Sequence, residues 1–501
     1  MIATTENTTQ AASTTMSASQ LSDIIQQVPQ VLGHMSHTSR RALLSTSRQF
    51  RSQMHQTATS IKVQSVDDIS LLVSQQRSHM KVVQMRGRGL RDLDARSLTE
   101  LAMADWPSLQ SLCLMNCAIE IFADQSAELS PLLLAKWPLL EAVDISNSYL
   151  GLASWKVLTE AHWPRLRWLN LCGNEADAAK LRCLVTGSWP KLEELGLAHN
   201  DIDEECMETL SKGNWPQLKK LNLHCCVQQA GAMAYLTLGS WPCLESLDLS
   251  KSYNIPVQGL IVLTEAHWPL LKHLDLKVTA GNLSVLPYLA EAWPKLQTLH
   301  LGNRSVNAKS MDHLVMCEWL HLRELCLSIS KLDATAIQRL SLGNWPNLND
   351  LDLESNSLSA CDIEVLVKGK WPKLQSLQLS ENHLDAAAMV HLANGSWPLL
   401  RRLGLASNRL TVKALQYLMK GAWFELETLD LSDNMIHREW GGRGDRGTGL
   451  TGSCCDAAIA VLRGDSNVIL KEGRNWLSPA EYLGYGLWPK MRSLNLSTFR
   501  V

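Results

Sequence analysis

The sequence lacks the features that mark membrane proteins and secreted proteins. No apolar run approaches the ~20 residues that a membrane-spanning helix needs. Residues 1–20 are polar, rich in Thr, Ser and Ala, and carry no apolar stretch typical of a secretory signal. We therefore expect the protein in the cytoplasm or the nucleus.

The sequence also lacks an excess of either charge. It has 47 Lys and Arg residues against 49 Asp and Glu residues, and its formal net charge is −2 at pH 7. Such a balance creates no global field that attracts nucleic acid or an anionic membrane. We expect neither nucleic acid nor a membrane as partner.

Motifs for catalysis and for metal or cofactor binding are missing too. No His-Glu-x-x-His, phosphate-loop or dinucleotide glycine motif occurs. The 13 cysteines are scattered without paired Cys-x-x-Cys sites. Several stand where we expect a core, so free buried thiols are a better interpretation than disulfides or zinc ligands. These cysteines include Cys183, Cys206, Cys243, Cys317 and Cys361. The sequence predicts a protein that is not an enzyme and holds no metal or cofactor.

Tryptophan is what the sequence has in abundance. Fourteen of its 18 tryptophans recur at one place of a repeated unit, and most are followed by proline. Between Trp137 and Trp423 the successive gaps are 25 to 27 residues, and nearly all are 26. A fixed period of this length indicates a solenoid of stacked units. The series comprises Trp106, Trp137, Trp163, Trp189, Trp215, Trp241, Trp268, Trp293, Trp319, Trp345, Trp371, Trp397, Trp423 and Trp488.

The first half of each unit predicts a short strand. After Trp371, Leu377 and Leu379 alternate with polar residues, which is the pattern of a strand with one buried face. Asn382 follows three residues later. A buried Asn there can bond the backbone of neighbouring turns, so stacked copies would form a ladder. The equivalent place holds Asn174, Asn200, Asn356, Asn408 and Asn434, and Cys117 and Cys226 in two other units.

The second half predicts a short helix. Asp385 occupies the expected N-cap position, and Met389 and Leu392 lie three residues apart on one helical face. Gly395 precedes Trp397 by two residues, and glycine there permits the left-handed conformation that ends a helix. Trp-Pro then forms the corner between helix and strand. Other expected N-caps are Asp177, Asp203, Asp333, Ser359 and Thr411, and other glycines of this type are Gly187, Gly213, Gly239, Gly343, Gly369, Gly421 and Gly486.

Units of the form Leu-x-x-Leu-x-Leu-x-x-Asn with an intervening helix resemble leucine-rich repeats. The resemblance covers residues 106–434 and again 483–498. The period is similar to that of the cysteine-containing subclass, which is frequent in F-box receptor proteins, although Trp-Pro stands where that subclass carries cysteine. The resemblance implies a right-handed α/β solenoid, a horseshoe with a parallel sheet on its concave face and short helices on its convex face.

The pattern divides the chain into segments. Residues 1–20 form a polar tail that we expect to be disordered, and 21–60 form a small helical segment. Residues 61–105 are expected to be capping repeats that cover the open end of the solenoid. The solenoid itself comprises residues 106–501, with a Gly- and Arg-rich loop at about 435–455.

The segment from Ser39 to Arg51 resembles the latter half of an F-box. That helical module joins a substrate receptor to the adaptor of a cullin ubiquitin ligase, but its opening Leu-Pro reads Leu21-Ser22 in this chain. The resemblance implies that the apolar residues of this segment bind the adaptor. These residues are Leu21, Ile24, Ile25, Val28, Leu43 and Leu44. A helical cap for the solenoid is the alternative, and both interpretations stay open.

Side chains between the strand leucines are expected to face the concave surface, in a column roughly 60 Å long at the spacing of neighbouring strands. They form a histidine-bearing basic area beside an acidic area. The interpretations are a solvated sheet face and a surface that selects a protein partner by complementary charge. The candidate residues are Lys220, His224, Asp248, His273, Asp275, Lys277, His300, Glu324, Asp350, Asp352 and Glu354.

The sequence thus predicts a monomeric, non-catalytic module that binds a protein on its concave face. The first hypothesis is a substrate receptor of an SCF-type cullin ubiquitin ligase. The alternative is a free-standing scaffold, inhibitor or regulator without a link to ubiquitin ligation.

Overall fold

The structure is a computed structural model. It describes residues 60–63, 69, 73, 79–86, 95–116, 129–435 (without 228, 230, 254, 280–282, 304 and 419), 470–472, 475–477, 490 and 493–495. The predicted tail, nearly all of the helical segment and most of the Gly- and Arg-rich loop lie outside this part of the chain. So do the predicted adaptor-binding residues Leu21, Ile24, Ile25, Val28, Leu43 and Leu44.

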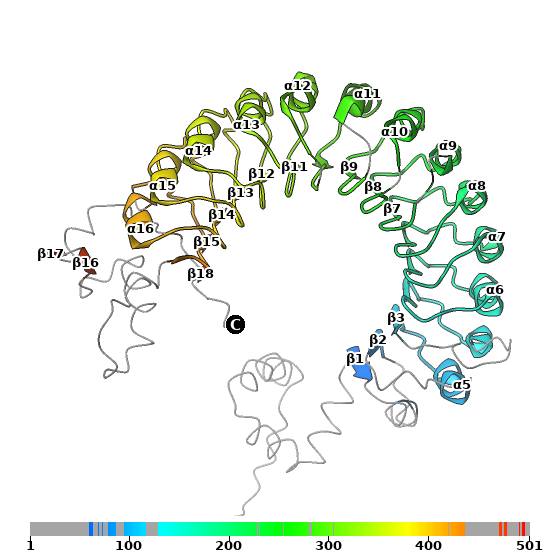
Figure 1. Cartoon of the computed structure of the whole chain (residues 1–501). Coiled ribbons are helices and arrows are strands. Elements are labelled where there is room, and N and C mark those ends of the chain that lie inside the picture. The colour runs from blue at the N-terminus through cyan, green and yellow to red at the C-terminus, as the bar shows by residue number, and fades with distance from the viewer. Residues whose placement is uncertain are drawn as a thin grey trace, which may run out of the picture.

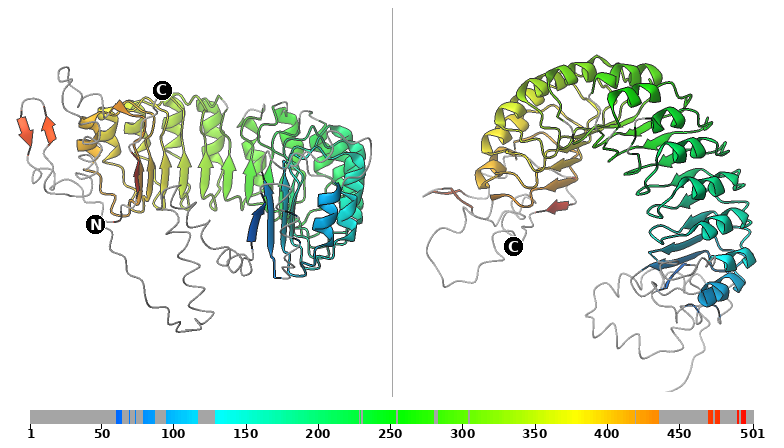
Figure 2. Two further views of the ribbon diagram at one scale, coloured as in Figure 1. Left: turned by 90° about the horizontal axis from the view of Figure 1, so that it is seen from below. Right: turned by 45° about the vertical axis from the view of Figure 1, so that its right-hand side comes forward.

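One parallel sheet runs through the molecule. It contains 16 strands, ordered β1 to β15 and then β18, so that each strand pairs with the next repeat's strand. The strands line the inside of a horseshoe and the helices its outside (Figure 1). Further views show that the strands stay side by side along the arc (Figure 2). The predicted α/β solenoid of leucine-rich-repeat type is confirmed.

The strands are short and in register, so that the leucine at the centre of one strand pairs with the leucine of the next, as in Leu299 and Leu325. They are β1 (Ser60–Val63), β2 (Val82–Arg86), β3 (Ser111–Met115), β4 (Ala142–Asp144), β5 (Trp168–Asn170), β6 (Glu194–Gly196), β7 (Lys220–Asn222), β8 (Ser246–Asp248), β9 (His273–Asp275), β10 (Thr298–His300), β11 (Glu324–Cys326), β12 (Asp350–Asp352), β13 (Ser376–Gln378), β14 (Arg402–Gly404), β15 (Thr428–Asp430) and β18 (Ser493–Asn495). A separate antiparallel pair is formed by β16 (Leu470–Glu472) and β17 (Asn475–Leu477).

Among the described elements, each strand from β2 to β14 is followed by one helix, except β9, which is followed by two, and the helices pack against their neighbours on the convex side. They are α5 (Ala95–Met103), η2 (Ser130–Leu134), α6 (Leu152–Glu160), α7 (Ala178–Thr186), α8 (Glu204–Ser211), α9 (Ala232–Leu236), α10 (Val257–Leu263), η3 (Leu283–Val285), α11 (Leu286–Ala292), α12 (Ala308–Met316), α13 (Ala334–Leu340), α14 (Ala360–Leu366), α15 (Ala386–Leu392) and α16 (Val412–Leu418).

Aspartate caps begin several helices, as predicted. Asp177 accepts a hydrogen bond from the N–H of Lys180 at 2.8 Å, which satisfies one of the free donors of the first turn. Asp203, Asp333 and Asp385 accept in the same way. The cap residue thus fixes where each helix starts.

The tryptophan column fills the core between sheet and helices. Every described member of the series is buried. Several neighbouring rings stack nearly parallel, with centroids 6.5 Å apart for Trp215 and Trp241 and 6.1 Å apart for Trp268 and Trp293. Stacked rings of this size contribute a large share of each repeat's apolar burial.

The glycines before the tryptophans do not act as predicted. Gly187 follows α7 with φ −65° and ψ 134°, which is not left-handed. Ala161 holds the same place in another repeat with φ −65° and ψ 132°, so this backbone conformation does not require glycine. A Cβ atom on Gly187 would lie 2.7 Å from the ring of Trp189. In this repeat the indole ring closes over the end of the helix and leaves no room for a Cβ atom, whereas the repeat of Ala161 accommodates one.

The predicted asparagine ladder is present in two blocks. Asn174 Nδ2 donates to the carbonyl of Ile145 at 2.8 Å, and Oδ1 of Asn200 accepts from the N–H of Asn174 at 3.0 Å. Asn356, Asn382, Asn408 and Asn434 make the corresponding bonds. In the repeats between the blocks other polar residues take this place. They are Cys226, whose thiol donates to Leu197, and Ser252, Thr279 and Ser330.

The residue before each ladder position is left-handed, with φ between 52° and 65° throughout the described repeats. This turn brings the ladder side chain inward. In the repeats that the structure describes, glycine occupies the place only at Gly173, and β-branched residues occupy it at Val278 and Ile329. The left-handed conformation is energetically unfavourable for β-branched residues, so the geometry of the repeat overrides their preference for an extended backbone.

The thiols are only partly where the sequence placed them. Cys206 and Cys317 are buried, Cys183 and Cys243 are half-buried, and Cys361 is exposed. Cys361 lies in the first turn of α14, whose buried residues are Ile363 and Leu366, so the prediction of a core position was wrong for it.

Candidate functional site

The aspartates that lie between the strand leucines on the concave sheet also stabilise the fold, which the sequence did not reveal. Oδ1 of Asp275 accepts from the N–H of Lys277 at 2.9 Å, two residues further on. Asp248 and Asp352 accept in the same way from the second residue after them. A carboxylate there holds the turn after its strand. These aspartates therefore belong to the fold as well as to the concave surface.

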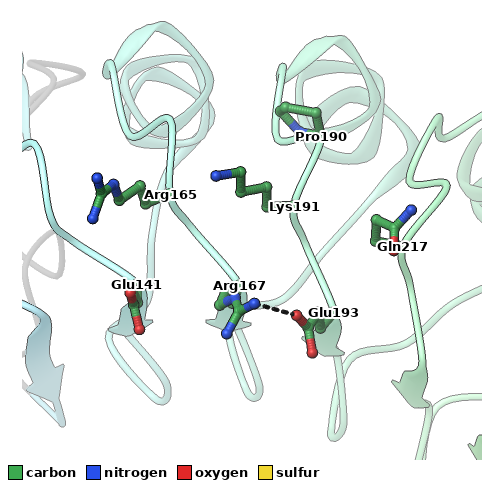
Figure 3. A pocket seen from close by; sticks show the side chains of 7 residues that line it. All are labelled: Glu141, Arg165, Arg167, Pro190, Lys191, Glu193 and Gln217. Carbon is green, nitrogen blue, oxygen red and sulfur yellow. Dashed lines mark ion pairs between the residues drawn. The ribbon is translucent and has the colours of Figure 1, made fainter.

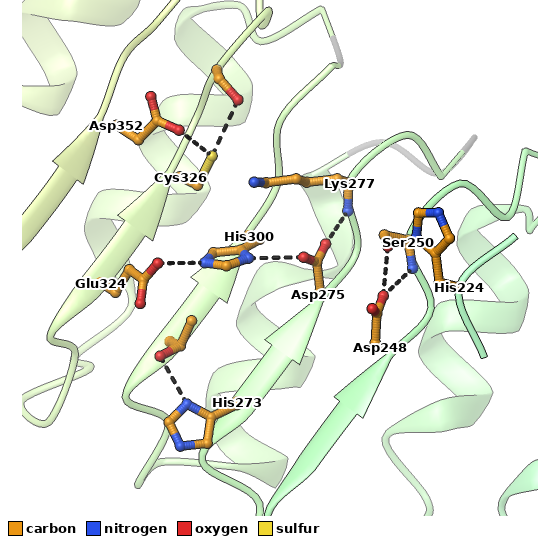
Figure 4. Close-up of polar contacts among 12 residues, drawn as sticks. His224, Asp248, Ser250, His273, Asp275, Lys277, His300, Glu324, Cys326 and Asp352 are labelled. Atoms are coloured by element: carbon orange, nitrogen blue, oxygen red, sulfur yellow. Dashed lines mark hydrogen bonds and ion pairs between the residues drawn. The ribbon is translucent and has the colours of Figure 1, made fainter. Parts of the chain in front are cut away.

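His300 lies at the centre of the candidate site, in β10. Its Nδ1 atom is 2.8 Å from Oδ2 of Asp275 in β9, and its Nε2 atom is 2.9 Å from Oε1 of Glu324 in β11 (Figure 4). One imidazole therefore joins three consecutive strands. The predicted basic area and the predicted acidic area meet at this residue.

The two carboxylates keep His300 positively charged. Burial lowers the pKa of His300, but the hydrogen bonds to Asp275 and Glu324 raise it more, to about 9. The hydrogen bond to His300 lowers the pKa of Glu324. For Asp275, burial raises the pKa, and the bonds to His300 and to the Lys277 backbone lower it below its ordinary value. At neutral pH the trio is an ion triplet with one positive and two negative charges.

A second group of side chains lies beside the triplet. The thiol of Cys326 donates to Oδ2 of Asp352 at 2.9 Å, and the amine of Lys277 extends toward it (Figure 4). Burial and the Asp352 carboxylate raise the pKa of Cys326 to about 11. Burial lowers the pKa of Lys277, but the neighbouring Cys326 and carboxylates raise it more. The pKa of Lys277 therefore lies above its ordinary value. We call Asp275, Lys277, His300, Glu324, Cys326 and Asp352 the central strip.

The central strip is poorly arranged for nucleophilic catalysis. Both ring nitrogens of His300 face carboxylates, so the ring cannot accept a proton from the Cys326 thiol. A thiol whose pKa is raised by burial and a neighbouring carboxylate is a weak nucleophile at neutral pH. The arrangement orders charges on a surface, which suits recognition better than bond making.

Two other histidines have separate partners. His224 Nδ1 lies 2.6 Å from Oγ of Ser250, which in turn donates to Asp248 (Figure 4). In a serine hydrolase the aspartate contacts the histidine, whereas here it contacts the serine. His273 Nδ1 lies 2.8 Å from the hydroxyl of Thr298. Burial lowers the pKa of both histidines.

The remaining predicted residues lie at the margins of the central strip. Lys220 pairs with Glu194 at 2.6 Å. Asp350 pairs with Arg402 at 2.7 Å, across two repeat periods. Burial, Asp352 and Glu381 raise the pKa of Glu354. The structure therefore gathers part of the predicted set and leaves Lys220 and Asp350 in ion pairs of their own.

Sequence reasoning missed Arg402, Cys326, Ser250 and Thr298 as partners. Each stands on the strand of its own repeat or, for Ser250, just after it. Cys326, Ser250 and Thr298 lie 25 or 26 residues from their contacts, and Arg402 lies 52 residues from its contact. Comparing each candidate residue with the residues at the equivalent strand positions one and two repeats away would have found these partners.

A hollow lies outside the concave surface, where β4, β5 and β6 begin. It encloses about 580 Å³. Arg165, Arg167 and Lys191 line it together with Glu141 and Glu193 (Figure 3). Nη2 of Arg167 lies 3.1 Å from Oε1 of Glu193, so part of its charge is neutralised internally.

Known proteins give little further guidance. No family profile and no curated protein sequence matches this chain. Among solved structures, the chain is similar to an internalin, InlF, from Listeria monocytogenes, at 18% identity and a TM-score of 0.40, with 70% of this chain and 86% of that one covered. It is also similar to the protein in a TLR13–ssRNA13 complex, at 19% identity and a TM-score of 0.41, with 76% and 57% covered. Among the described residues, no helix is long and apolar enough to cross a membrane.

Proposed function

We propose that the protein is an interaction module that binds a protein partner on the concave sheet, at the central strip. The observation that carries the proposal is the His300 triplet, which fixes charged side chains of three neighbouring strands in one arrangement. Side chains held in place before binding lose little entropy when a partner arrives. Charges in a fixed order also discriminate between partners.

The electrostatic pattern supports a polar partner surface. Glu324 remains 47% exposed although it contacts His300, so one side of its carboxylate faces solvent. Glu354, whose pKa is raised by burial and by Asp352 and Glu381, adds negative charge at the end of the central strip. A partner that places cationic groups there would relieve this repulsion.

The finer proposal is a substrate receptor of a cullin ubiquitin ligase. It rests on the F-box-like segment from Ser39 to Arg51 and on the repeat array that follows it in the sequence. The segment would hold the ligase adaptor while the concave sheet holds the target. A scaffold or inhibitor without a ligase link remains the alternative, with residues 21–60 serving as a cap.

Co-purification of the full chain from its native cell separates the two. The ligase proposal predicts that adaptor and cullin subunits accompany the wild type and are lost with Leu43→Asp and Leu44→Asp, whereas Leu238→Asp keeps them. Leu238 is the control because it is exposed on the helical side of the solenoid. Full recovery of other partners without any ligase subunit would favour the scaffold.

A further inference from the structure

The outer rim carries exposed apolar side chains that the repeat does not require. Met316 is 78% exposed and Leu342 is 63% exposed, each three residues before the tryptophan of its repeat. Seven repeats hold polar residues at this place, namely Glu160, Thr186, Lys212, Glu265, Lys368, Asn394 and Lys420, whereas Met103, Leu134 and Leu238 are apolar and exposed there like Met316 and Leu342. Since polar side chains satisfy the fold there, the apolar ones are not needed for it, and the surroundings of Met316 and Leu342 set these two apart. Exposed apolar clusters of this kind mark interaction sites.

A third exposed apolar residue, Leu320, comes four residues after Met316 in the sequence. Leu320 replaces the proline that follows tryptophan in most units, and its side chain is 50% exposed. Its carbonyl accepts from Nδ2 of Asn347 at 2.7 Å, which ties it to the following repeat. Met316 ends α12 and Leu342 follows α13 by two residues, and these neighbouring helices lie on the outside of the horseshoe (Figure 1). Leu320 follows Trp319 at the corner after α12.

A cationic hollow adjoins Leu342. It encloses about 540 Å³ between the ends of α13 and α14, and its lining includes Val365, Arg339, Lys368 and Lys370 but no carboxylate. Arg339 pairs with Asp312 at 3.2 Å. Within the described part of the chain, Lys368 and Lys370 form no ion pair, and both are exposed. The hollow therefore presents free positive charge beside an apolar wall.

The geometry points to a second protein-docking site on this rim, which takes an amphipathic acidic segment of a partner protein. Apolar side chains of the segment cover Met316 and Leu342, and carboxylates that follow them reach Lys368 and Lys370. We call these four residues the rim site. Charge complementarity selects the acidic segment over a basic one. The site is separate from the central strip, so its occupancy does not depend on binding at the concave face.

Selection of short random peptides on the full-length protein tests the site. The expected peptides combine Leu, Ile or Phe with Asp or Glu a few residues further on. Leu342→Glu should weaken the selected peptides roughly tenfold or more, as expected for a central apolar contact. Lys368→Gln with Lys370→Gln should weaken them severalfold and remove most of their salt dependence. Leu238→Glu is the matched control, since Leu238 holds the same place in another repeat and is 67% exposed.

Three outcomes would overturn the proposal. The selection could yield no apolar-acidic sequences, or the peptides could bind Leu342→Glu as tightly as the wild type. Sedimentation could also show that the wild type self-associates and that Leu342→Glu abolishes it, in which case the occupant is a second copy of the chain. Circular dichroism of each variant checks that the fold is kept, which is expected because all the substituted side chains are exposed.

Discussion

Nδ1 of His300 lies 2.8 Å from Oδ2 of Asp275, and this contact joins β10 to β9 at the middle of the arc. The same ring contacts Glu324 on the other side, so a single side chain spans three repeats. Solenoids are stabilised by contacts between neighbouring units. A charged bridge at this point contributes to stability and orders the surface on which we propose that a partner binds.

The bridge predicts a specific pH dependence. The pKa of His300 rises from 6.5 to about 9 on folding, so its contribution is complete below pH 6.5 and is lost as pH rises through about 9. The lowered pKa values of Asp275 and Glu324 make their share present above their ordinary values of 3.8 and 4.5, and it is lost as pH falls further. The stabilisation should therefore be greatest between about pH 5 and 6.5.

Chemical unfolding of the wild type and of His300→Gln at a series of pH values measures how much the His300 bridge stabilises the fold. The wild type should be more stable by at most about 3 kcal/mol in that window, and the difference should shrink above about pH 9. His383→Gln, at an exposed position, is the control and should show no such profile. A difference that stays constant across pH would contradict the ion triplet.

The asparagine ladder predicts a large loss for a small truncation. Asn382→Ala removes the amide that donates to Leu353 and Leu379 and the oxygen that accepts from Asn356 and Leu358. Unsatisfied buried groups cost about 1–3 kcal/mol each, so we expect a loss of roughly 3 kcal/mol in urea unfolding. Asn394→Ala, at an exposed position two residues after α15, should cost less than about 1 kcal/mol. Equal losses for both variants would contradict the ladder.

The left-handed turns predict a stabilising substitution. Ile329 has φ 56° and is exposed, a conformation that disfavours a β-branched residue. Ile329→Asn should raise the free energy of unfolding by about 1 kcal/mol, because asparagine tolerates this region. Val390→Asn, an exposed helical position of α15, should instead be neutral or destabilising. The thermal unfolding midpoints of both variants distinguish relief of an unfavourable backbone conformation from a general effect of a more polar surface.

The thiols predict unequal reactivity. Cys326 is buried, donates to Asp352 and has its pKa raised to about 11, whereas Cys361 is exposed. In the native protein at pH 8, iodoacetamide should therefore modify Cys361 well before Cys326, as read by mass spectrometry of peptides. In urea the two rates should converge. Fast native labelling of Cys326 would mean that the central strip opens readily.

The repeat and its core could be predicted from the sequence, but the contacts between side chains on the concave surface could not. Trp189 and Asn382 could be predicted as core and ladder because their spacing repeats, and burial follows from period alone. The role of Gly187 was misread because its φ is ordinary and the constraint is the neighbouring ring, which local sequence does not display. The His300 bridge depends on the rotamers of side chains on neighbouring strands. The repeat spacing shows which residues lie on neighbouring strands, but it does not show which of them form hydrogen bonds.

The central claim is that a protein partner binds at the central strip. Proximity labelling in the native cell tests it most directly, comparing the wild type with Glu354→Lys, which reverses a charge at the end of the strip. Glu265→Lys, an exposed charge reversal just after α10, is the control. The account predicts a set of labelled proteins that is shared by the wild type and the control and lost with Glu354→Lys. Identical labelling by all three proteins would contradict it.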